Sequence, residues 1–319
     1  KRVGGTWDGS NQNAGSALSD LPTWVIAESK PGSDDIFVAV ITNAGQLHAM
    51  RWNGATNSWG DQIQTTALPA TKDNQCVDVA FERDSGEAFL IWGDSNKNLV
   101  YRRFTTSWQS ESNAYANMAD LAYWVTAAYD PRSTSDNFAV GMSLNNGNYE
   151  FAAWNGSWVT RPAAIASLDK TQRGIDVAFE TNTGRAMFAF VTLASSTQMT
   201  WRTWGSSGGF SGTSTQAGTS GNINFMQLRA DPNSNDIMAL YSDANDDLFN
   251  RKWSGSSWSA IGTALEATLS VSISREPFMF AWHIKVYPKS VSESVTPTDS
   301  PARGWSGARS QIETSTLTE

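Results

Sequence analysis

The chain has 319 residues, of which 40% are hydrophobic and 17% are charged, and its net charge is −8 at pH 7. This acidic balance argues against a nucleic-acid partner, because phosphates require a basic surface. No apolar run reaches the roughly 18 residues of a membrane-spanning helix, so the sequence indicates a protein that does not span a membrane.

The first elements along the chain follow a period of two. Residues 24–29, 35–42 and 46–52 are rich in Val, Ile, Phe and Trp, and turns containing Gly, Asn and Asp separate them. Such alternation predicts half-buried β-strands. A hairpin at Asn53-Gly54 leads to a weaker fourth strand that starts near Trp59. The pattern predicts four strands per unit and no amphipathic helix.

Two kinds of unit then alternate along the chain. The segment that starts at Asp78 (DVAFE) returns at Asp176, and Trp24 in the other kind of unit returns as Trp124. Each unit spans about fifty residues, which is a period typical of β-propeller blades. The complete units are predicted at residues 22–66, 75–116, 122–162, 174–214 and 223–264.

Every complete unit repeats the same aromatic hairpin. An aromatic residue ends the third strand, a tight turn follows, and a second aromatic starts the outer strand. Large rings at these places would fill the wedge between neighbouring blades. The first aromatics are Trp52, Phe104, Trp154, Trp204 and Trp253, and the second are Trp59, Trp108, Trp158, Phe210 and Trp258.

These units predict an all-β fold, a β-propeller of four-stranded blades over residues 1–287. We expect six blades, with a closing unit built from residues 1–15 and 275–287, so that strands from both termini close the ring. Five blades with extra terminal strands is the alternative. Residues 288–319 are rich in Ser, Thr and Pro and predict a flexible tail.

The Trp-Asn-Gly hairpins at Trp52 and Trp154 resemble those of lectin-type propellers, the tachylectin group and the fungal fucose-binding lectins. The resemblance covers residues 22–282 at the level of strand pattern. It implies a propeller that binds sugars. In the fungal lectins, an Arg and a Glu of one blade act with an aromatic of the next.

The candidate ligand-binding residues are three outer-strand tryptophans and three arginines near third-strand aromatics. Indole rings at the rim could stack on the C–H faces of a sugar, while guanidinium groups donate hydrogen bonds to its hydroxyls. The alternative is that these tryptophans only pack between blades. The residues are Trp59, Trp158, Trp258, Arg51, Arg202 and Arg251.

Two turns place oxygen-bearing side chains at alternate positions, which is typical of calcium loops. The alternative is a solvated turn stabilised by its Asp and Asn side chains. The sequence predicts no other cofactor and no catalytic residue. The candidate calcium ligands are Asp94, Asn96 and Asn98 in one turn and Asp243, Asn245 and Asp247 in the other.

The sequence therefore predicts a secreted, extracellular or cell-surface, non-enzymatic recognition domain that binds glycans or protein partners. Its low charge and its many Ser, Thr, Asn and Gly residues are common in secreted β proteins. One alternative is a structural or adhesive subunit of an extracellular assembly that self-associates. The third is an enzyme resembling a glycoside hydrolase, which needs two carboxylates across a sugar.

Overall fold

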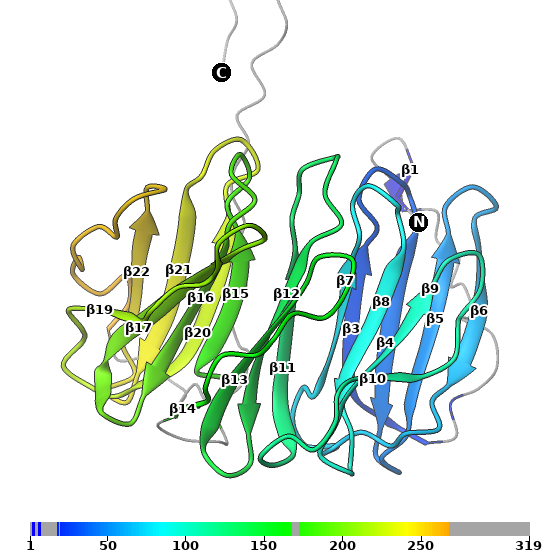
Figure 1. The fold of residues 1–319 in the computed structure, drawn as a ribbon, viewed down its shortest axis with the longest axis horizontal. Helices are drawn as coiled ribbons and strands as arrows, with labels where there is room; N and C mark the ends of the chain where they lie inside the picture. Colours follow the sequence, from blue (N-terminus) through cyan, green and yellow to red (C-terminus); the bar gives the residue numbers. More distant parts are fainter. Residues whose placement is uncertain (1, 4–5, 8–17, 19, 168–171, 268–319) are drawn as a thin grey trace, which may run out of the picture. The chain divides into compact units, whose positions relative to one another are not determined.

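The computed structural model describes residues 2–3, 6–7, 18, 20–167 and 172–267. Within these ranges all regular structure is β, in antiparallel sheets that follow one another in chain order (Figure 1). The predicted all-β class and four-stranded antiparallel sheets are confirmed. Among the described residues, no helix has the length and apolar character needed to cross a bilayer.

The N-terminal part contributes one short hairpin, in which β1 (Arg2–Val3) pairs with β2 (Thr6–Trp7). It falls within the predicted closing unit. The rest of that unit, including residues 275–287, and the predicted tail at 288–319 lie outside the described residues.

Three sheets contain four strands each, paired in chain order. The first sheet consists of β3 (Pro22–Ser29), β4 (Ile36–Thr42), β5 (Leu47–Asn53) and β6 (Ser58–Gln64). The second consists of β7 (Val77–Phe81), β8 (Ala88–Gly93), β9 (Leu99–Phe104) and β10 (Ser112–Tyr115). The third consists of β11 (Ala122–Tyr129), β12 (Phe138–Leu144), β13 (Asn148–Trp154) and β14 (Ile165–Ala166).

The last two sheets depart from this pattern in their outer strands. The fourth contains β15 (Ile175–Phe179), β16 (Ala186–Thr192) and β17 (Ser195–Gly205), and both β18 (Gly209–Phe210) and β19 (Ser214–Gln216) pair with β17. The fifth contains β20 (Ile223–Ala230), β21 (Ile237–Asp243) and β22 (Leu248–Trp253). Beyond β22, the bridges Trp253–Trp258 and Leu248–Glu266 lie where a fourth strand is expected.

The aromatic hairpins have the same geometry in all five sheets, because the two aromatics lie directly opposite each other across the turn. Trp52 pairs with Trp59, and their ring centroids are 5.5 Å apart. Trp154 and Trp158 are likewise 5.5 Å apart. The remaining pairs are Phe104–Trp108, Trp204–Phe210 and Trp253–Trp258, at 5.3, 6.4 and 5.6 Å.

One hydrophobic cluster fills each interface between successive sheets. The cluster between the first two sheets contains Phe37 and Trp92, and the next contains Phe89 and Trp154. Both faces of the middle sheets are therefore buried, which explains why β8 and β12 consist entirely of buried residues.

Two kinds of hydrogen bond recur between the second and third sheets and between the fourth and fifth. The buried Glu82 accepts a bond from Trp154 Nε1, and Glu180 accepts one from Trp253 Nε1, both at 2.6 Å. Asp78 accepts the main-chain N–H of Ala127 at 2.7 Å. Asp176 accepts that of Leu228, also at 2.7 Å. The repeated acidic residues of the even units therefore join neighbouring sheets.

We expect Glu82→Ala to lower the free energy of unfolding by about 1–3 kcal/mol, because it leaves the buried Trp154 Nε1 without an acceptor. Glu87→Ala is the matched control in the same hairpin. Its carboxylate pairs with the more exposed Arg103 at 3.0 Å, and loss of such a surface pair costs about 0–1 kcal/mol. Urea unfolding of both variants measures the difference. Equal losses would contradict a role for Glu82 in joining the sheets.

Candidate functional site

The three outer-strand tryptophans lie in separate sheets and do not converge on one site. Trp59 is half-buried against Trp52. Trp158 is half-buried and contacts four other rings, those of Trp154, Tyr101, Tyr115 and Phe138. Trp258 is 7% exposed and packs on Trp253. Trp158 and Trp258 pack between sheets, whereas Trp59 packs on Trp52 of its own hairpin. The role of all three in ligand binding stays a prediction.

The three candidate arginines also lie against protein groups. Arg51 Nε is 2.9 Å from Asp61 Oδ2. Arg202 lies between Phe151 and Phe210, with its guanidinium carbon 5.0 and 5.2 Å from the ring centroids. Burial lowers the pKa of this guanidinium.

The third arginine, Arg251, is 2% exposed and donates from Nε to the Tyr241 hydroxyl at 3.0 Å. Much of the donor capacity of these arginines is therefore used within the protein. Their role as sugar-binding residues stays a prediction, as it does for the tryptophans.

The two candidate calcium turns are held by their first Asp. Asp94 Oδ1 accepts the main-chain N–H of Asn96 at 2.9 Å and of Asn98 at 2.7 Å. Asp243 Oδ1 does the same for Asn245 at 3.0 Å and Asp247 at 3.3 Å. These bonds stabilise each turn through its own side chain. Within the described ranges, no three His, Cys, Asp or Glu side chains lie close enough to hold a metal ion.

A pocket of about 500 Å³ lies where the second and third sheets meet, and it contains Tyr115, Glu150 and Arg161. The Arg161 guanidinium forms an ion pair with Glu150 and lies 4.7 Å from the centroid of the Tyr115 ring. Burial raises the Tyr115 pKa to about 12, although Arg161 opposes the shift. Sequence reasoning missed this site, because its residues belong to two sheets and have no counterpart in the repeat.

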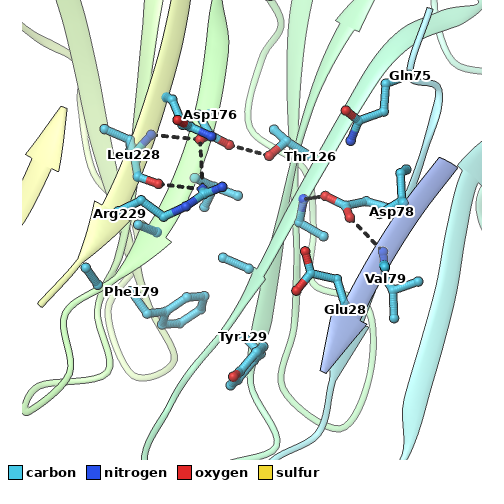
Figure 2. A pocket seen from close by; sticks show the side chains of 18 of the residues that line it. Glu28, Gln75, Asp78, Val79, Thr126, Tyr129, Asp176, Phe179, Leu228 and Arg229 are labelled. Carbon is cyan, nitrogen blue, oxygen red and sulfur yellow. Dashed lines mark hydrogen bonds and ion pairs between the residues drawn. The ribbon is translucent and has the colours of Figure 1, made fainter. Parts of the chain in front are cut away.

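A larger cavity, of about 930 Å³, is lined by the first strands of all five sheets, β3, β7, β11, β15 and β20. Figure 2 shows two acidic groups on opposite sides of it. Asp176 and Arg229 lie on one side, and Asp78 and Glu28 on the other (Figure 2). The topology brings together side chains that are far apart in the sequence.

Cationic and neutral donors surround the first acidic group, Asp176. Its Oδ1 accepts bonds from the Thr126 hydroxyl and, at 3.4 Å, from Arg173. Its Oδ2 accepts the main-chain N–H of Leu228 and lies 3.8 Å from Arg229 Nη1. Two guanidinium groups therefore neutralise this carboxylate.

The second acidic group is compensated less, because the charge of Arg173 acts on Asp78 without an ion pair between them. Asp78 is 7% exposed and accepts only main-chain N–H groups, from Val79 at 2.8 Å and Ala127 at 2.7 Å. Burial raises its pKa to about 8, and the like charge of Glu28 adds to the shift. Glu28 is exposed to the cavity, yet desolvation by the walls still raises its pKa, while Arg229 opposes the increase. The negative charge of Glu28 therefore favours the protonated form of Asp78.

The chain is similar in structure to several solved proteins. The lectin BP39L from Burkholderia pseudomallei is 13% identical with a TM-score of 0.53, over 76% of this chain and 71% of that chain. AofleA from Arthrobotrys oligospora is 12% identical with a TM-score of 0.50, over 79% and 72%. The fucose-specific lectin from Aleuria aurantia is 12% identical with a TM-score of 0.47, over 76% and 77%.

The predicted resemblance to lectin-type propellers is confirmed by the BP39L lectin, and at such an identity the likeness is one of fold. No protein-family model matches the chain, and no curated protein matches its sequence.

The free energy of unfolding should fall as pH rises from about 4 to about 8. Folded Asp78 keeps its proton up to a pKa of about 8, whereas an unfolded Asp releases it near pH 4. Glu28→Gln removes the like charge and lowers the Asp78 pKa. We therefore expect the free energy of unfolding of this variant to fall less between about pH 5 and about pH 8 than that of the wild type, as measured by urea unfolding at both pH values.

Glu87→Gln, in the hairpin between β7 and β8, serves as the control for this experiment and should keep the wild-type slope. A Glu28→Gln variant with the wild-type slope would show that the two carboxyl groups do not interact.

Proposed function

We propose that this protein is a non-enzymatic recognition domain that binds glycans where neighbouring sheets meet. The proposal rests above all on the pocket that holds Tyr115, Glu150 and Arg161. It combines an aromatic ring, a carboxylate and a guanidinium group within one hollow of about 500 Å³.

These three groups supply what sugar recognition requires. A carboxylate accepts hydrogen bonds from hydroxyls, a guanidinium donates to them, and charged partners strengthen each bond. Glu150 and Arg161 already hold each other through an ion pair, and their side chains are 8% and 25% exposed. The pocket is therefore pre-organised and still reachable from solvent, as ligand sites commonly are.

The fold supports the same function, because the BP39L lectin shares it. We extend this to secretion and to an extracellular or cell-surface location, where glycans and protein ligands are displayed. The rim residues Trp59, Trp158 and Trp258 remain candidates for additional contacts, and the turns at Asp94 and Asp243 remain the candidate calcium sites.

We further propose that six sheets form a closed propeller, with the closing unit covering β3. Val25 on β3 is 58% exposed, whereas its repeat equivalent Val125 is 1% exposed. A sixth sheet would bury this face. Five blades is the alternative. The exposure of Val25 also favours a second candidate function. In that case the protein is a structural or adhesive subunit, and another copy covers β3.

An enzyme resembling a glycoside hydrolase is the third alternative, and the cavity carboxylates would be its natural site. Asp78 and Asp176 each accept a main-chain N–H of the next sheet. Because both groups join sheets, the arrangement favours recognition over hydrolysis.

Wild-type protein should bind a defined set of ligands on a glycan array. Arg161→Met should weaken binding of the best ligand by about tenfold or more, because loss of a charged hydrogen bond costs about 1.5–3 kcal/mol. Arg103→Met is the control, since Arg103 pairs with Glu87 in another part of the second sheet. Calorimetry with that ligand measures both effects. An array with no bound glycan, or equal effects of the two variants, would contradict the proposal.

The proposed cover of β3 predicts that Val25→Asp lowers the free energy of unfolding by about 1–3 kcal/mol, because it buries an unpaired charge. Leu193→Asp is the control at a site that is 62% exposed and should change stability by less than about 0.5 kcal/mol. Urea unfolding at several protein concentrations separates the alternatives. A loss that depends on concentration would favour a second copy as the cover, and equal effects of both substitutions would rule out any cover.

A further inference from the structure

The cavity between the first strands has an uneven charge distribution that folding does not explain. Asp176 faces Arg173 and Arg229. By contrast, no Lys or Arg in the described part of the chain forms an ion pair with Glu28 or Asp78. The ion pairs therefore lie on the Asp176 side of the cavity, whereas Arg229 and Arg173 act on Glu28 and Asp78 only through longer-range attraction.

The repeat shows that Glu28 is not a requirement of the scaffold. Its equivalents in the third and fifth sheets are Ala128 and Arg229, although the preceding strand position is apolar in all three strands. Asp78 and Asp176, in contrast, occupy one repeated position and join sheets. Glu28 therefore adds negative charge at a place where packing accepts an uncharged side chain.

A second feature of the cavity points independently to a ligand. Gln227 lines the cavity and is 2% exposed, yet its Oε1 has no hydrogen-bond partner. An unsatisfied buried carbonyl costs free energy, which a donor from a ligand would recover. The Gln227 carbonyl and the Glu28 carboxylate can therefore both accept hydrogen bonds from a ligand.

The shape of the site discriminates between kinds of cation. A bare metal ion would need several converging ligands, and no such group of three exists among the described residues. A cavity of about 930 Å³ instead suits a small organic molecule. Its walls also include the rings of Tyr129 and Phe179, which lie below the acidic groups in Figure 2.

We propose that this cavity binds a hydroxylated primary amine of the size of an amino sugar, with the ammonium group on Glu28 and Asp78. Hydroxyl groups of the ligand donate to Gln227 Oε1 and accept from Arg229. This site is separate from the pocket at Arg161, and the inference does not rest on the proposed glycan recognition there.

Calorimetric titration with glucosamine, glucose and N-acetylglucosamine at about pH 7 tests the proposal, since an amine is largely charged there. We expect glucosamine to bind at least about tenfold more tightly than the other two, because a charged hydrogen bond contributes about 1.5–3 kcal/mol. Equal binding of all three sugars, or no binding of glucosamine, would overturn it.

Variants assign the binding to the cavity. Glu28→Gln should reduce glucosamine affinity to that of glucose. Gln227→Met should lower glucosamine affinity more than the control Glu87→Gln, which lies in the hairpin between β7 and β8. A thermal melt of each variant checks that it is folded. Glucosamine affinity that survives Glu28→Gln in folded protein would overturn the proposal.

One further variant separates this inference from the proposed glycan site. Arg161→Met should leave glucosamine binding unchanged even where it abolishes binding of the array ligand. Loss of glucosamine binding in Arg161→Met would place the amine in the inter-sheet pocket and overturn the cavity assignment.

Discussion

The structure depends on one constraint, which is that each sheet has two apolar faces and cannot bury both alone. The hydrophobic clusters lie between successive sheets and not within any one of them. Each aromatic ring at such an interface removes roughly 150–250 Å² from water. The cross-strand aromatic pairs fix the spacing of the sheets, and the acidic residues that join them fix their register. Both possible ligand sites arise from this stacking.

Much of the fold could be predicted because its signals are local. Strand alternation and the hairpins at Trp52 and Trp154 each lie within a dozen residues or so. Such short patterns predict strands and tight turns directly. The repeat then extends one local pattern to all five sheets. The outer strands after Trp204 and Trp258 are harder to predict from sequence, because few residues there alternate and short bridges replace regular pairing.

The cavity could not be predicted, because its residues are joined only by the stacking of sheets. Asp78 lies in an apolar strand, and the repeat has Asp176 at the same position. This repetition indicates a structural role, which both residues also have because they join sheets. Glu28 ends a strand like many exposed acids. The candidate calcium turns are ambiguous for a different reason, because Asp94 and its alternate Asn residues suit both an ion and a turn closed by main-chain N–H groups.

The hydrogen bonds between sheets alternate in kind along the chain. A Glu receives an indole N–H across the second and third sheets and again across the fourth and fifth. Between the third and fourth sheets, no such Glu–indole bond occurs among the described residues. There the Thr126 hydroxyl donates to Asp176, and Phe151 meets Phe188 edge to face, with ring centroids 5.3 Å apart. The true building block is therefore a doublet of sheets. Excising a single sheet would bring two mismatched faces together, whereas excising or inserting a whole doublet would preserve every type of junction. A family of such proteins could thus grow or shrink only by even numbers of sheets.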